Sequence, residues 1–74
     1  MPRYFFEIED GDTVFEDEYG QELPNDEAAL KSGERLASEF AGDPQFAGWT
    51  LVVFTGADGV IGEFVIPVVK EMLQ

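Results

Sequence analysis

Apolar and polar side chains alternate in the first part of the chain, and this pattern predicts a β-hairpin. Within residues 3–9 the apolar positions on one side are Tyr4, Phe6 and Ile8, which is the two-residue period of a strand with one wet face. Residues 10–12, Asp-Gly-Asp, are typical of a turn, and residues 13–16 return as a short second strand. Four residues leave open whether Val14 or Phe15 points inward.

A helical period replaces the alternation after a polar connection at residues 17–24. Asn25 supplies an N-cap, and the acids that follow it suit the positive end of a helix that begins near Asp26. Small and apolar positions then recur at helical spacing: Ala29, Gly33, Leu36, Ala37 and Phe40. Because Gly33 lowers helix propensity by about 1 kcal/mol relative to alanine, we expect it to let the helix lie close to a sheet. Residues 42–44, Gly-Asp-Pro, end the helix.

A second hairpin is predicted after the helix. Residues 49–55 are apolar on both faces, residues 56–59 are typical of a turn, and residues 60–69 return as a longer strand. Two hairpins joined by one helix give a β-β-α-β-β chain, an α+β fold in one domain over residues 1–74. A right-handed crossing puts the first strand beside the third, so we expect a four-stranded antiparallel sheet in the order 2-1-3-4 with one helix on one face. Pro67 cannot donate to a ladder and is expected on an edge strand.

The predicted core lies between the helix and the sheet. Its expected members are Phe6, Ile8, Leu36, Phe40, Leu51, Val53, Phe64 and Ile66. Trp49 is expected to pack at the core or its rim, in preference to stacking on a ligand.

The sheet carries more apolar side chains than one helix covers. Alternation sends Phe5, Val52, Phe54, Val65 and Val69 to the face away from the helix. A large apolar patch on an acidic chain marks an interface, so we expect a homodimer or higher oligomer through these residues. The alternative is that Met72 and Leu73 fold back and cover part of this face.

Composition narrows the chemistry. The 74 residues carry 16 acidic and 4 basic side chains, a net charge of −12, with no histidine and no cysteine. This excludes zinc fingers, iron-sulfur sites, disulfide frameworks and histidine-assisted nucleophiles, while 45% hydrophobic residues favour a folded domain over an acidic tail. The acidic surface is repelled by phosphate backbones and anionic lipids. We expect a cytoplasmic protein with no nucleic-acid partner, no membrane partner and no cofactor, since no segment approaches the roughly 20 apolar residues of a membrane helix.

The densest polar cluster surrounds the first hairpin and the loop after it. Its members are Glu7, Glu9, Asp10, Asp12, Glu16, Asp17 and Glu18. Grouped carboxylates suit calcium or magnesium, but the Asp10-Gly11-Asp12 spacing lacks the further ligands and terminal glutamate of a calcium loop, so no metal site is expected. These acids instead support an alternative function, an acidic regulator that occupies a basic surface on another protein.

No enzyme is expected. Ser32 and Ser38 lie on the predicted helix without a histidine to activate them, and paired carboxylates need a concave site that one helix on a sheet does not offer. The first hypothesis is therefore a non-catalytic oligomerising or protein-interaction module.

Several segments together resemble a family of short bacterial proteins of unknown function. They are Met1-Pro2-Arg3-Tyr4-Phe5-Phe6-Glu7-Ile8, Asp10-Gly11, Asp17-Glu18-Tyr19-Gly20-Gln21-Glu22-Leu23-Pro24 and Glu27-Ala28-Ala29. The resemblance spans about the first half of the chain, and it implies no activity, cofactor or catalytic residue. The predicted outline is also similar to the small sheet-plus-helix domain of antitoxins that neutralise RNA-cutting toxins, an analogy of fold alone.

Overall fold

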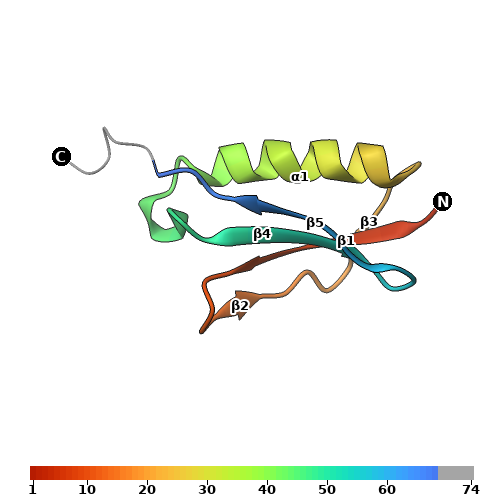
Figure 1. Cartoon of the computed structure of the whole chain (residues 1–74), viewed down its shortest axis with the longest axis horizontal. Helices are drawn as coiled ribbons and strands as arrows, with labels where there is room; N and C mark the ends of the chain where they lie inside the picture. The colour runs from red at the N-terminus through yellow and green to blue at the C-terminus, as the bar shows by residue number, and fades with distance from the viewer. Residues whose placement is uncertain (69–74) are drawn as a thin grey trace.

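An antiparallel sheet with one long helix across one face makes up residues 1–68, the part of the chain that the computed structural model describes (Figure 1). The elements are β1 (Arg3–Glu9), β2 (Val14–Phe15), β3 (Gln21–Glu22), α1 (Asp26–Phe40), a 3₁₀ helix η1 (Pro44–Phe46), β4 (Thr50–Thr55) and β5 (Gly59–Val65). The predicted α+β class is confirmed.

The sheet contains one strand more than the sequence predicted. Its order is β2-β1-β4-β5, and β3 also pairs with β1, where Arg3 lies opposite Glu22. The predicted four-stranded sheet is corrected to five strands, because the segment assigned to a polar connection returns to the edge of β1. This pairing is carried by the main chain, with the amide of Leu23 donating to the carbonyl of Pro2 at 3.1 Å, so residues 21–22 lack the apolar alternation that would have revealed it.

The last strand is shorter than expected. β5 ends at Val65, so the prediction that Pro67 lies within an edge strand is wrong. Pairing extends only to Ile66, whose amide donates to the carbonyl of Trp49 at 2.7 Å. Pro67 has no amide hydrogen with which to continue a ladder. Val69, also expected in this strand, lies outside the described residues.

The helix lies very close to β4 and β5. The Asn25 side chain accepts a hydrogen bond from the amide of Ala28 at 2.9 Å and caps the helix as predicted. A Cβ atom on Gly33 would lie 2.7 Å from Cγ2 of Val53, and one on Gly62 would collide with Leu30. The two glycines thus permit the approach expected of Gly33, and they hold α1 over the β4 and β5 half of the sheet.

The core lies between α1 and the sheet, with buried side chains from both β1 and β4. The buried members are Tyr4, Ile8, Ala29, Ala37, Leu51, Val53 and Ile66. Of the expected core, Phe6, Leu36, Phe40 and Phe64 are only partly buried and pack against it. The phenolic oxygen of Tyr4 donates to Oδ1 of Asp26 at 2.7 Å. Burial, then this hydrogen bond and the charge of Asp26, raise the pKa of Tyr4 to about 12.

An aromatic cluster closes one end of the helix and sheet pair. Phe15 lies opposite Ile8 in the register, so it, and not Val14, is on the helix side. Its ring stacks on Trp49 at 5.7 Å, and Phe46 contacts both Trp49 and Phe40 edge to face at 5.3 and 5.2 Å. The packing role expected for Trp49 is confirmed.

Replacing Gly33 by alanine should destabilise the fold although it favours the helix. The added methyl gains about 1 kcal/mol of helix propensity, but it meets Val53, a stiff and fully buried side chain. We expect a net loss of about 1–3 kcal/mol in denaturant unfolding. Gly62→Ala is the matched comparison, because it meets the rotatable end of half-buried Leu30 and should lose less. Equal stability of Gly33→Ala and the native chain would contradict this packing.

Candidate functional site

The sheet face away from α1 mixes apolar and acidic side chains. We call it the outer face. Arg3, Val14 and Glu22 lie on it along the β1, β2 and β3 edge. Its central members are Phe5, Glu7, Glu9, Thr50, Val52, Phe54, Val60, Glu63 and Val65. They form three rows across β1, β4 and β5. Phe5, Phe54 and Val60 form the first, Glu7, Val52 and Glu63 the second, and Glu9, Thr50 and Val65 the third.

The residues expected at an apolar interface differ in exposure. The rings of Phe5 and Phe54 stack at 5.4 Å and are half-buried, and Val52 is buried between Glu7 and Glu63. Val65 is 68% exposed. The fifth expected member, Val69, lies outside the described residues. The outer face is therefore not a continuous apolar patch, because its central row is mostly carboxylate.

Val60 is an outer-face residue that the sequence pattern missed. Its side chain is 60% exposed. Strict alternation from Val65 would turn Ile61 outward and Val60 inward. A register shift opposite Val53 and Phe54 reverses the two, so that Val60 pairs with Phe54 and Ile61 packs against the core. A bulge has no reliable signal in the sequence beyond the glycine beside it, Gly62.

The Glu7 carboxylate is repelled by acidic neighbours. Partial burial raises the pKa of Glu7 above its ordinary value, and the charges of Glu16, Glu9 and Asp17 add to the effect in that order. Glu63 lies across β4 on the same face. A positive charge placed here would relieve this repulsion.

Two of the seven predicted acids, Asp10 and Asp17, accept hydrogen bonds from backbone amides. Oδ1 of Asp10 accepts from the amides of Asp12 and Thr13 at 3.0 and 2.8 Å and shapes the turn. Of the others, Glu7 and Glu9 lie on the outer face, while Asp12, Glu16 and Glu18 are exposed on the hairpin and its loop.

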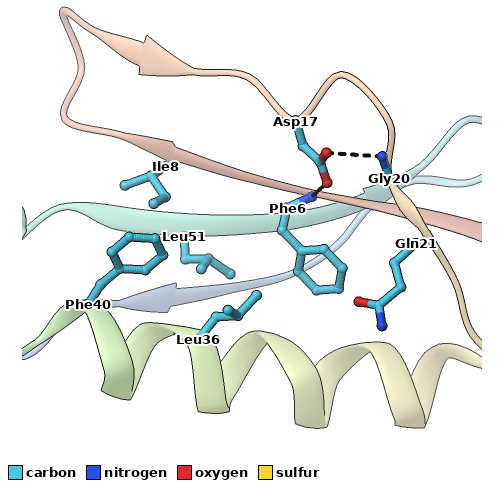
Figure 2. A pocket seen from close by; sticks show the side chains of 8 residues that line it. All are labelled: Phe6, Ile8, Asp17, Gly20, Gln21, Leu36, Phe40 and Leu51. Carbon is cyan, nitrogen blue, oxygen red and sulfur yellow. Dashed lines mark hydrogen bonds between the residues drawn. The ribbon is translucent and has the colours of Figure 1, made fainter.

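Asp17 has a structural task. Its Oδ2 accepts from the amide of Phe6 at 3.2 Å, and its Oδ1 accepts from the amide of Gly20 at 3.0 Å (Figure 2). The same Oδ1 also accepts from the amide of Tyr19 at 3.2 Å. The amide of Phe6 lies between the stretches of β1 that pair with β2 and β3. The carboxylate thus fills the gap in the hydrogen bonding along this edge.

A groove remains on the helix side because α1 covers only the β4 and β5 half. Figure 2 shows the residues around it, which come from α1, β1, β3, β4 and the loop that carries Asp17. They are Phe6, Ile8, Asp17, Gly20, Gln21, Leu36, Phe40 and Leu51, around a volume of about 380 Å³. The sequence did not predict this groove, since periodicity shows which helix positions face a sheet but not how much of the sheet they cover.

Within residues 1–68, no three acidic side chains converge closely enough to hold a metal ion. No helix in the same stretch has both the length and the apolar composition needed to cross a membrane.

Together these features define a small α+β domain in which one helix covers half of a sheet and the outer face is apolar and acidic. The chain belongs to the family described as Domain of unknown function (DUF6894), whose model matches residues 3–64. The match includes α1 and most of the second hairpin as well as the first half on which the resemblance rested. No curated protein and no solved structure matches the chain.

Removing the Asp17 carboxylate should weaken the fold. Asp17→Ala leaves the amides of Phe6, Tyr19 and Gly20 without their acceptor, so we expect a loss of about 1–3 kcal/mol in denaturant unfolding. Exposed Glu18 is the control, and Glu18→Ala should change stability by less than about 0.5 kcal/mol. Equal losses in the two variants would show that Asp17 is only a surface charge.

Glu7 should make the fold less stable as the pH rises from acid to neutral. Since its folded pKa is raised, its carboxyl binds a proton more readily in the folded than in the unfolded chain, and its contribution is lost as the pH rises through the folded pKa. Glu7→Gln should therefore raise the melting temperature at pH 7, with little gain below the ordinary value of 4.5. Glu34→Gln removes the same charge from an exposed position on α1. A gain from Glu34→Gln as large as that from Glu7→Gln would assign the effect to net charge alone.

Proposed function

We propose that the chain is a non-catalytic protein-interaction module whose outer face binds a basic protein. The observation that carries this proposal is the arrangement of the outer face. Exposed Val60 and Val65 flank a row that contains Glu7 and Glu63, and no element within residues 1–68 covers them. Apolar groups supply the area to bury, and the carboxylates select the partner.

Charge favours a basic partner over a second copy on this face. A two-fold pair through the outer face would bring six carboxylates together, from Glu7, Glu9 and Glu63 of each copy. Each chain also carries a net charge of −12. Lysine or arginine side chains of another protein would instead pair with these carboxylates. They would also offset the charges of Glu16, Glu9 and Asp17, which add to the effect of burial in raising the pKa of Glu7.

A homodimer is the second candidate. The exposed fractions of Val60 and Val65, 60% and 68%, favour it. Such a dimer should form more readily at high salt, because screening weakens repulsion between the two acidic chains. A complex with a basic partner should have the opposite salt dependence.

The non-catalytic part of the proposal is supported by composition. The chain has no histidine and no cysteine. The serines of α1 thus have no histidine base, and the strongly shifted Tyr4 pKa is explained by burial and by its hydrogen bond to Asp26.

Two triple variants of equal charge test the proposal. The first changes Glu7, Glu9 and Glu63 to glutamine, and the control changes Glu27, Glu34 and Glu39, which are exposed on α1. We expect immobilised native chain to capture a basic protein from extracts of its own cells. The outer-face triple variant should lose this protein at least tenfold, while the control retains it.

Salt and a single apolar position complete this test. Capture should fall steeply between about 50 and 300 mM salt, and Phe54→Lys should abolish it. Equal losses in both triple variants would mean that binding depends only on net charge, and capture that is unaffected by Phe54→Lys would exclude the outer face.

A further inference from the structure

One edge of the sheet is open in the part of the chain that the structure describes. The order β2-β1-β4-β5 makes β1 and β5 the long strands nearest the two edges. The β1 edge is closed by β2, by β3 and by the Asp17 carboxylate on the amide of Phe6. Within residues 1–68, β5 pairs only with β4.

The register shows which backbone groups of β5 point away from the sheet. Ile66 donates to the carbonyl of Trp49 and accepts from the amide of Gly48, at 2.7 and 3.0 Å, so its backbone groups point toward β4. Antiparallel ladders alternate along the strand. Phe64 and Gly62 therefore also bond to β4, and the amide and carbonyl of Glu63 and Val65 point to the open edge.

These outward groups have no other partner in the described part of the chain. Outside the strand ladders, no hydrogen bond within residues 1–68 involves the backbone of Glu63 or Val65. Edge strands are commonly protected by bulges, prolines or lysines. In β5 the bulge lies before Gly62 and Pro67 lies after Val65, so residues 62–65 form a regular stretch between them in which Glu63 is the charged residue.

We propose that residues 62–65 of β5 take up an extended segment of the basic partner as an additional strand of the sheet. This inference rests on the proposed function and names the element through which the partner binds. Backbone pairing supplies the affinity, as in other cases of strand addition. On the outer face the added strand would lie beside exposed Glu63 and Val65. The partner segment should therefore carry a lysine or arginine beside Glu63 and an apolar residue beside Val65.

Charge also decides against a second β5 strand at this edge. A two-fold antiparallel pair centred on Glu63 would set two glutamates directly opposite, which destabilises a ladder. Any other register still brings together two chains of net charge −12.

A short peptide tests the edge directly. The probe is acetyl-Lys-Val-Thr-Lys-Lys-amide, in which the valine and the second lysine lie two residues apart and share one face of a strand. It is added to the full chain at low salt, and amide hydrogen exchange is followed by NMR. Without peptide, the amides of Glu63 and Val65 should exchange at least tenfold faster than the amide of Phe64, which bonds to β4. Saturating peptide should slow Glu63 and Val65 at least tenfold. The same peptide with every interior amide N-methylated keeps the charges but lacks the donors, and it should give no protection.

A substitution at Val65 removes the outward donor. Val65→Pro deletes an amide that makes no bond to β4, and an edge strand tolerates proline, so the fold should persist by circular dichroism while peptide affinity falls at least tenfold. Val65→Thr keeps the amide and should bind as the native chain does. If Val65→Pro does not fold, the comparison of the native and N-methylated peptides still tests whether the peptide pairs with the β5 edge.

The outcomes separate this inference from the proposed function. If the peptide shifts the signals of Phe5 and Phe54 but leaves exchange at Glu63 and Val65 unchanged, the outer face binds cations and the strand-addition inference is wrong. Protection of Glu63 and Val65 that rises with protein concentration in the absence of peptide would assign the edge to a second copy and overturn the inference. No binding of the peptide at low salt would also overturn it, while the proposed function would still stand or fall by the triple glutamine variants.

Discussion

The close contact of α1 with β4 and β5 is the constraint on which the rest of the structure depends. It is possible because Gly33 faces Val53 and Gly62 faces Leu30, at distances that leave no room for a Cβ atom. A helix held this tightly over one half of a sheet cannot also cover the other half. The partial burial of Phe6 and the groove beside it follow from this placement.

The β1 edge of the sheet is closed by two short strands, β2 and β3, and by the loop between them. Between β2 and β3, the Asp17 carboxylate takes the place of a paired strand by accepting a hydrogen bond from the amide of Phe6. The same carboxylate accepts hydrogen bonds from the loop that leads into β3. Gly20 has a positive φ of 71°, and a Cβ atom there would lie 2.8 Å from the carbonyl of Tyr4. Only glycine allows this loop to lie so close to β1. One edge of the sheet is closed in this way, which leaves β5 as the edge that is open within residues 1–68.

The acidic side chains take up a defined arrangement only in the folded state. Glu7 on β1 and Glu63 on β5 are far apart in the sequence, but in the sheet they lie on either side of Val52 on the outer face. Other acids serve the backbone, as Asp10 and Asp17 do. The protein-interaction function that we propose therefore depends on a surface with mixed apolar and acidic rows. This surface lies next to backbone groups of β5 that have no partner within residues 1–68.

The sequence by itself determined the elements whose signal is local. The alternation in β1, the Asn25 cap and the spacing of Ala29, Gly33 and Ala37 depend on near neighbours, and each was predicted correctly. Tertiary structure alone decided β3, the end of β5 at Val65, the outward turn of Val60 and the structural role of Asp17. Each of these depends on which distant backbone group lies opposite. Such long-range pairing leaves no periodic pattern in the sequence, because hydrogen bonds between main-chain groups place little demand on the identity of the side chain.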